Sequence, residues 1–252
     1  MARWTIHFFA AGLLAAHVAG ETEFRRSMDR VSSMDPAVAS SLYAARAVQL
    51  VYEPLLEFDY RVRPYALIPG LAETLPDVHS NGLVYVFRLH PDARFQPDRC
   101  FGTDAAGQPR GRPVTADDVV FSLKRLADRR VASPGAWLVE DTVAGMRAFA
   151  DASVAGSKTD YSLPVGGLRA LDARTVRIEL ARPMHPFMWY LAMSYSAVVP
   201  HEAVKLYGAG FGSHAVGTGP YRLTGWQRNH QMTYTRDPSW RGWRKGPAAV
   251  CA

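Results

Sequence analysis

The chain has 252 residues, of which 48% are hydrophobic and 21% charged, enough apolar side chain for one large buried core or two smaller ones. This composition excludes a wholly disordered chain. Beyond the N-terminus no apolar run reaches about 18 residues, which excludes a polytopic membrane protein. Two cysteines are too few for a disulfide scaffold or a structural zinc cluster. The net charge is +6, but the arginines stand singly among acidic and apolar neighbours, so we expect no nucleic-acid partner.

The first twenty residues have the layout of a secretory signal peptide. Arg3 supplies a positive start, an apolar stretch interrupted only by His7 follows, and small residues close the segment. The alternative is a short buried helix, and the stretch is too short for a membrane span. We therefore predict a signal peptide over 1–20 and export to the periplasm. In that oxidising compartment Cys100 and Cys251 could pair, or each could lack its partner.

The predicted elements mix helices and strands along the whole chain. The first half of the chain should hold an irregular lead-in (21–40), a helix (42–52), two strands (55–58 and 83–89), a long loop (96–113) and a capped helix (115–126). The second half should hold a further helix (143–150), a strand–turn–strand unit (168–171 and 175–180), and two short helices (186–193 and 201–207) around a short strand (197–199). A closing strand pair (221–226 and 231–235) follows. Leu42, Ala45, Val48 and Tyr52 are the predicted buried stripe of the first helix. The fold class is α/β or α+β.

The clearest element is the helix that Thr115 opens. Thr115 suits the N-cap, and Asp117 and Asp118 lie in the first turn, where the helix dipole favours acidic side chains. Two adjacent carboxylates are also the groups of general acid–base catalysis. Helix capping accounts for both of them and is the favoured interpretation.

Catalytic motifs are absent from the sequence. Ser213 lacks the flanking glycines of a nucleophile elbow. His201 and Glu202 begin like a zinc-protease motif, but Lys205 stands where the second histidine is needed. The glycine-rich stretch 208–212 follows a predicted helix, whereas a phosphate loop follows a strand. We therefore predict no enzyme, no catalytic residue, no metal site and no cofactor.

Seven local motifs follow one another in a fixed order. They are SMDPA at 33–37, VYEPLL at 51–56, PGLAE at 69–73, YVFRLHP with RF at 85–95, GRPVTADDVVFS at 111–122, GTGPY at 217–221 and RDPSW at 236–240. Together they resemble the extracellular solute-binding proteins of family 5, the oligopeptide, dipeptide and nickel receptors of ABC importers. The stretch 111–122 is the most specific of the seven.

The resemblance implies an α/β fold of the type II periplasmic binding protein kind, a two-lobed clamp that closes on its ligand. The units it implies are a signal peptide (1–20), a first ligand-binding lobe made of two parts (21–52 and 165–245), a small α+β insert domain (53–164) and an atypical tail (246–252). Members of the family are considerably longer than this chain. We therefore expect a truncated protein, with the first lobe and the insert domain present and the second lobe absent.

The resemblance also implies a function. A non-catalytic periplasmic component would deliver an oligopeptide or dipeptide to the permease subunits of an ABC importer, and at this length it would be unable to clamp its ligand. The implied ligand-binding residues are Ser33, Met34, Trp137, Gly217, Thr218 and Gly219. Turn geometry is the structural alternative for the glycines and core packing is the alternative for Trp137. The other functional hypothesis is a secreted, non-catalytic interaction module that works at this length. The choice among peptide, nickel, haem, opine and sugar ligands stays open.

Overall fold

The computed structural model describes residues 2–7, 14–18, 21–27 and 30–245, with side chains from 30 to 243. The helices are α1 (Leu42–Val51), α2 (Ala116–Ala127), α3 (Met146–Ala152), α4 (Phe187–Tyr190) and α5 (His201–Tyr207). The strands are β1 (Ala2–His7), β2 (Leu14–Val18), β3 (Glu21–Ser27), β4 (Leu56–Asp59), β5 (Ala66–Pro69), β6 (Asp77–His79), β7 (Val84–Arg88), β8 (Asp98–Thr103), β9 (Pro109–Arg110), β10 (Leu168–Ala170), β11 (Thr175–Glu179), β12 (Tyr221–Gln227) and β13 (Gln231–Arg236).

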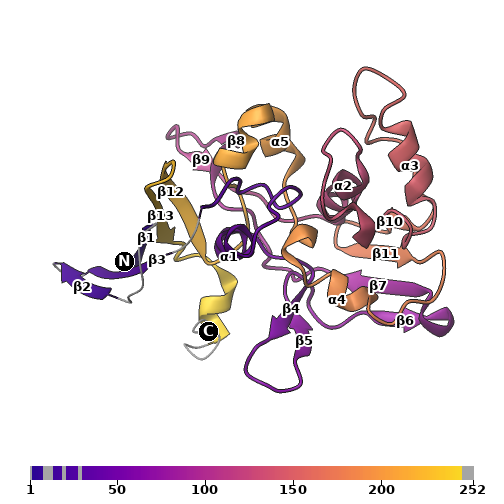
Figure 1. Cartoon of the computed structure of the whole chain (residues 1–252), viewed down its shortest axis with the longest axis horizontal. Helices are drawn as coiled ribbons and strands as arrows, with labels where there is room; N and C mark the ends of the chain where they lie inside the picture. Colours follow the sequence, from indigo (N-terminus) through magenta and orange to yellow (C-terminus); the bar gives the residue numbers. More distant parts are fainter. Residues whose placement is uncertain (1, 8–13, 19–20, 28–29, 246–252) are drawn as a thin grey trace.

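Two sheets and two hairpins hold these strands. One sheet has the order β12-β13-β1-β3-β2 and the other the order β10-β11-β7-β6, while β4 pairs with β5 and β8 with β9. All pairs are antiparallel except β1 with β3. In Figure 1 the two sheets lie toward opposite ends of the molecule with α1 between them, and the β4–β5 hairpin projects away from the body.

Most of the expected elements form within a residue or two of their predicted ends. The α2 helix begins with the predicted cap: Thr115 and Asp118 form a capping box. The alternating stretch 83–89 forms β7 and buries Tyr85 and Phe87 on the predicted face. The helix at 42–52 also forms, because Ser41 Oγ accepts a hydrogen bond from the Ala44 backbone N–H.

Three expectations about local structure were wrong. The lead-in is not irregular throughout, because 21–27 form β3. The loop 96–113 contains the β8–β9 hairpin, whose turn is closed by Asp104 Oδ1 accepting the N–H groups of Ala106 and Gln108, both at 2.9 Å. Residues 197–199 form no strand: the Val198 N–H donates to Glu53 O and the Val199 N–H donates to Ser122 Oγ, so the two residues join no common ladder.

The buried stripe of α1 also differs from the prediction. Its buried residues are Ala44, Ala47, Val48 and Val51. Of the predicted stripe, Val48 and the C-cap residue Tyr52 are buried as expected. Leu42 is 62% exposed, and Ala45 is partly exposed. The buried face is thus turned around the helix axis relative to the predicted one. It contacts the segment before β12 on one side and the 3-10 turn Ser194–Ser196 on the other, which the spacing of apolar residues does not reveal.

The segment predicted as a signal peptide lies partly outside the described residues. Its described parts are β1 and β2, and β1 runs between β13 and β3, with Arg3 opposite Thr235. Strand pairing does not test whether 1–20 are removed, so the signal peptide stays a prediction. The tail 246–252, with Cys251, lies outside the described residues, and the pairing of the cysteines stays a prediction as well. In the part of the chain that is described, no helix has the length and apolar character needed to cross a bilayer.

Buried side chains form two hydrophobic clusters. The larger core lies between β7, β11, α2 and α3, and the smaller core lies between α1, β12 and β13. Strands β10 and β11, which the predicted division gives to the first lobe, lie in the sheet with β7 and pack in the larger core. The division into lobe and insert domain itself stays a prediction.

A buried ion pair joins the two cores. Asp35, in the lead-in, accepts two hydrogen bonds from the guanidinium of Arg125 on α2, both 2.6 Å long. Both side chains are less than a tenth exposed. Asp35 Oδ1 also accepts the Ala37 N–H at 3.1 Å, so the carboxylate fixes the turn of the lead-in while it neutralises Arg125. Each charge is neutralised by the other, so removing one partner leaves the remaining charge buried without compensation.

We expect Asp35→Asn to destabilise the protein by about 3 kcal/mol or more, because it leaves the Arg125 charge buried without a counterion. Urea unfolding followed by circular dichroism measures this loss. The matched control is Asp59→Asn, which breaks the surface pair between Asp59 and Arg61 and should leave the unfolding midpoint unchanged. Equal midpoints for wild type and Asp35→Asn would contradict the assignment.

Candidate functional site

The lead-in residues Ser33 and Met34 are held against the loop before β12. The Met34 N–H donates to Gly212 O at 2.8 Å, and the Asp35 N–H donates to Ser33 Oγ at 3.0 Å. The Met34 side chain is fully buried, with its Sδ 3.7 Å from Tyr234 Oη. Of the two predicted binding residues, Ser33 is thus partly exposed, whereas Met34 packs in the smaller core.

The GTG stretch packs against the C-terminal end of α1. The Gly219 N–H donates to Val51 O at 2.8 Å. A Cβ on Gly217 would lie 1.9 Å from Val51 O, and one on Gly219 would lie 2.8 Å from the Val51 carbonyl carbon. Neither glycine has a positive φ, so close packing of two backbones explains them, and turn geometry does not. Thr218 between them is 2% exposed.

Gly217→Ala should therefore destabilise the protein by about 1–3 kcal/mol, because the added methyl group overlaps the Val51 carbonyl. Chemical denaturation gives the free energy of unfolding. In Gly166→Ala the new Cβ meets no atom within 4 Å and the backbone needs no positive φ. This control should differ from wild type by no more than about 1 kcal/mol. Similar losses in both variants would refute close packing as the reason for Gly217.

Trp137 stands apart from the other predicted residues and is exposed. It lies in the 3-10 turn Ala136–Leu138, and its side chain is 52% exposed, which rules out core packing as its explanation. Its ring meets that of Tyr190 edge to face, with centroids 5.0 Å apart. The indole thus has one edge fixed by the protein while much of its surface is left open.

The loop that carries Trp137 is anchored to the lead-in. Ser133 Oγ donates to Ala37 O, and the same oxygen accepts the Gly135 N–H at 3.0 Å. Gly135 packs so closely on the ring of Tyr195 that a Cβ would lie 2.7 Å from it. Trp137 therefore lies on a turn that these contacts hold against the end of the lead-in.

Leu42 is a second exposed apolar residue near the lead-in in sequence. It is the first residue of α1, five positions after Ala37, to which the Trp137 loop is tied. The sequence interpretation placed Leu42 in the core and missed it as a surface residue. The signal that could have found it is its position directly after the Ser41 N-cap, in a first turn whose buried residues begin only at Ala44.

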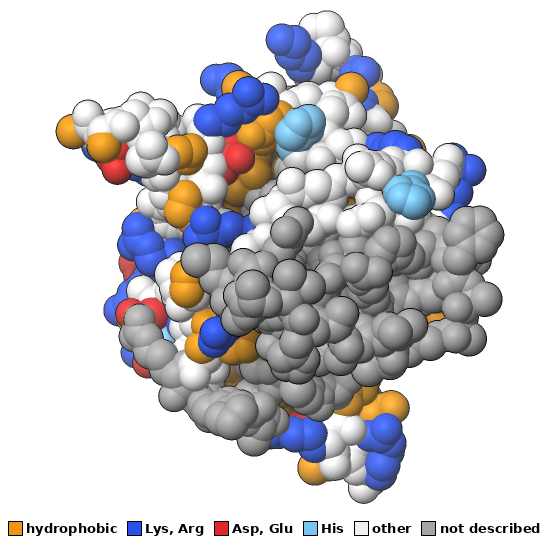
Figure 2. Space-filling model, turned by 90° about the vertical axis from the view of Figure 1, so that its left-hand side faces the viewer, with side chains coloured by type: hydrophobic (Ala, Val, Ile, Leu, Met, Phe, Trp, Pro, Cys, Tyr) orange, Lys and Arg blue, Asp and Glu red, His pale blue; other side chains and the backbone are white. Residues whose placement is uncertain are grey.

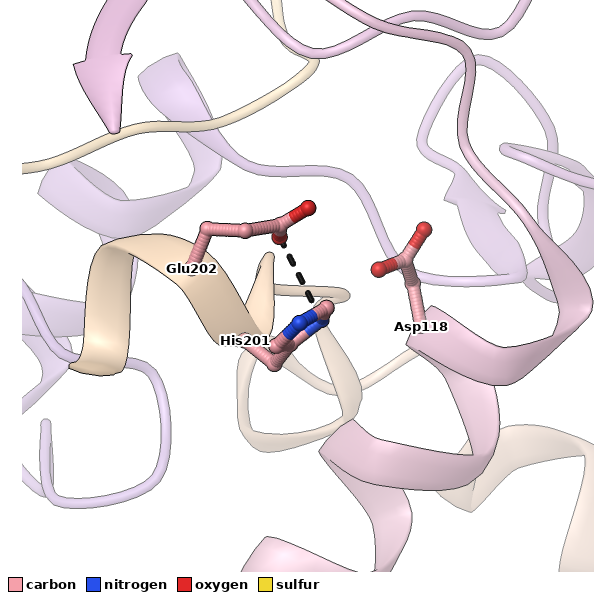
Figure 3. A group of neighbouring side chains, drawn as sticks. All are labelled: Asp118, His201 and Glu202. Atoms are coloured by element: carbon pink, nitrogen blue, oxygen red, sulfur yellow. Dashed lines mark ion pairs between the residues drawn. The ribbon is translucent and has the colours of Figure 1, made fainter. Parts of the chain in front are cut away.

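Three polar side chains lie close together between α2 and α5. Figure 3 shows Asp118 on α2 facing His201 and Glu202 on α5, with His201 Nδ1 3.3 Å from Glu202 Oε2. Ligand atoms of the three lie within 4.8 Å of one another, as metal ligands do. However, Arg112 donates to both carboxylates, over 2.7 Å to Asp118 Oδ1 and 2.6 Å to Glu202 Oε2. A cation here would have to displace a guanidinium, so we interpret the group as an ion-pair network that ties α5 to the start of α2.

This network makes a pH-dependent contribution to stability. Burial acts to raise the pKa of the Glu202 carboxyl, but hydrogen bonds from Arg112 outweigh burial and hold that pKa below its ordinary value of 4.5. The contribution is therefore complete above about pH 4.5 and is lost as the pH falls through the lower pKa of the folded state.

We expect Glu202→Gln to be less stable than wild type near pH 7, and the difference in unfolding midpoint to shrink below about pH 4, where wild-type Glu202 takes up its proton. Urea unfolding at both pH values measures this difference. A difference that stays constant across this range would show that the Glu202 charge contributes nothing through Arg112.

The basic side chains do not form a continuous stripe on the face shown in Figure 2. On the described part of that face, Lys and Arg stand in separate groups among uncharged and apolar side chains. A nucleic-acid backbone contacts charges at regular spacing, which these groups do not offer. The expectation of no nucleic-acid partner stays a prediction.

Solved structures of bacterial periplasmic peptide-binding proteins share this fold. The chain superposes on the oligopeptide-binding protein OppA of Burkholderia pseudomallei with a TM-score of 0.65 and 28% identity, covering 85% of this chain and 38% of that one. The murein tripeptide-binding protein MppA of Escherichia coli gives a TM-score of 0.67 at 24% identity, over 86% and 38%. The fold is therefore that of the periplasmic solute-binding proteins, and the α/β prediction is confirmed.

The chain belongs to the bacterial extracellular solute-binding proteins of family 5, whose middle-region model matches residues 66–250. The probable ABC transporter periplasmic-binding protein SapA of Escherichia coli (strain K12) is 33% identical over 226 residues, which cover 84% of this chain and 36% of SapA. The periplasmic oligopeptide-binding protein OppA of Salmonella typhimurium is 29% identical over 222 residues, covering 87% and 36%. The predicted family resemblance is confirmed, and the chain spans 36% of the length of these two relatives.

Proposed function

We propose that this chain forms one lobe of a peptide-binding component of an ABC importer, that it acts in the periplasm after export, and that it performs no catalysis. Of its relatives, OppA is a periplasmic oligopeptide-binding protein by name, and SapA is a probable ABC transporter periplasmic-binding protein. The observation that carries the proposal is the exposed indole of Trp137 on an anchored turn beside the lead-in. Its partners in transport would be the permease subunits of the importer.

The exposed apolar surface suits a peptide ligand. Trp137 and Leu42 are more than half exposed, and the Trp137 ring is fixed by its edge-to-face contact with Tyr190. An aromatic side chain held in place at the surface offers a large apolar area on which a ligand can pack. The peptide backbone would be recognised by N–H and C=O groups of the lead-in and its neighbouring loops, which read chain length and tolerate varied side chains. Ser33 and Ser40 are polar groups of the lead-in that retain partial or full exposure.

A single lobe gives such a ligand one wall. Binding sites for small ligands bury most of the ligand surface, whereas an open face buries one side of it. The cost of association, at least about 4 kcal/mol, then outweighs much of the gain from the contacts. We therefore propose that this chain alone binds peptide weakly, and that tight binding requires a second wall opposite Trp137.

Isothermal titration of the full chain with a pool of tripeptides to pentapeptides tests the proposal. We expect a Kd weaker than about 100 μM, which corresponds to less than about 5.5 kcal/mol of binding free energy. Trp137→Ala should abolish the residual heat, because it removes the exposed aromatic wall. Tyr65→Ala, which removes a similarly exposed aromatic from the β4–β5 hairpin, is the matched control and should bind as wild type does.

Two results would count against the proposal. Affinity near 1 μM for the pool would show that one lobe suffices, and would favour the hypothesis of a module that functions at this length. Equal binding by wild type and Trp137→Ala would show that peptide does not use the face beside the lead-in.

A further inference from the structure

A cavity of about 230 Å³ lies away from the Trp137 face and shares no lining residue with it. Its walls come from the loop after β7, the turn before β12 and the segment after β13, and the residues that matter for its chemistry are Arg94, Pro97, Thr218, Asp237, Trp240 and Arg241. One of them, Thr218, is a predicted binding residue, so the structure separates it from Trp137.

The two innermost charges of this cavity are neutralised by the protein itself. Asp237 accepts hydrogen bonds from Arg222 at 3.0 and 3.2 Å. Arg241 donates to both oxygens of Glu53, each over 2.8 Å. These pairs make rigid walls, and neither offers an uncompensated charge to a ligand.

Two other groups have hydrogen-bonding capacity left. Thr218 Oγ1 is buried and has no hydrogen-bond partner among the described residues, although a buried hydroxyl ordinarily has one. Arg94 lies exposed at the mouth, where the described residues give its five-donor guanidinium one hydrogen bond, 3.2 Å from Nη2 to Gly111 O. The cavity thus has Arg94 and the carboxylate of Asp92 at its exposed edge, and the Thr218 hydroxyl is buried behind its lining.

Trp240 supplies a fixed apolar wall. Its indole Nε1–H donates to Glu53 Oε1 at 3.3 Å, and its ring stands edge to face on Trp243 with centroids 4.9 Å apart. Pro97 adds a second apolar surface. The volume is below the roughly 300 Å³ at which pockets for drug-sized ligands begin, so the cavity fits a small molecule.

We propose that this cavity binds a small organic carboxylate, with the carboxylate at Arg94 and the apolar part against Trp240 and Pro97. Guanidinium and carboxylate match each other in charge and in bidentate geometry, and charge-assisted hydrogen bonds of this kind are the stronger ones in proteins. The inference goes beyond the proposed peptide binding, because it concerns different residues and a different ligand class.

Titration of the full chain with benzoate, followed by calorimetry and tryptophan fluorescence, tests the proposal. Benzamide is the uncharged match for benzoate. We expect benzoate to bind with a millimolar Kd and benzamide to bind at least about tenfold more weakly, because it lacks the charge that pairs with Arg94. Arg94→Gln should weaken benzoate binding by a similar factor, and Arg94→Lys by less.

Two control variants separate this site from other effects. Arg110→Gln removes an equally exposed arginine from β9, and Trp137→Ala alters the proposed peptide face; both should bind benzoate as wild type does. No binding of benzoate at about 20 mM, equal affinity for benzamide, or equal loss in Arg94→Gln and Arg110→Gln would each overturn the proposal. Loss of peptide binding in Trp137→Ala with benzoate binding intact would show that the two sites are independent.

Discussion

The buried pair between Asp35 and Arg125 is the contact on which the arrangement of the two cores depends. Asp35 belongs to the lead-in that enters the smaller core, and Arg125 belongs to the helix that covers the larger one. A charged pair with so little exposure tolerates neither the loss of one partner nor a large shift between them, since either leaves a charge without compensation in a poorly solvated place. The lead-in therefore has one position on α2, and the turn that carries Trp137 is fixed in consequence, because Ser133 is tied to Ala37 two residues after Asp35.

Local signals in the sequence were sufficient for most elements. Thr115 and Asp118 specify the start of α2 by themselves, because a capping box involves only residues three apart. The β7 strand follows from alternation alone. The orientation of α1 was not predictable in this way: two of its faces carry apolar residues, and the choice between them is made by Gly217 and Gly219, which lie far away in sequence and close to Val51 in space.

The residues of the two proposed sites were harder to predict for the same reason. Trp137 looks like a core residue by composition, but it is exposed, on a loop that a hydrogen bond from Ser133 to Ala37 ties to a segment 96 residues away. The family resemblance found Trp137 and the GTG stretch but implied a single binding wall. The structure places the two on different surfaces, because the glycines are required by backbone packing and Thr218 lines a separate cavity. Arg94 and Trp240 stand in two of the seven family motifs, but the resemblance gave neither of them a binding role.

Helix α1 runs from the end of the lead-in to the glycines that flank Thr218. Leu42 begins it beside the lead-in, and Val51 ends it against the glycines that flank Thr218. Its ten residues span about 15 Å, and the residues on its buried face are fully enclosed, so any movement would involve the helix as one rigid unit. Any influence of one surface on the other would therefore travel as a shift of the whole helix along or about its axis. Such a shift would displace the glycines beside Thr218 together with the start of the helix, although the two proposed sites share no residue.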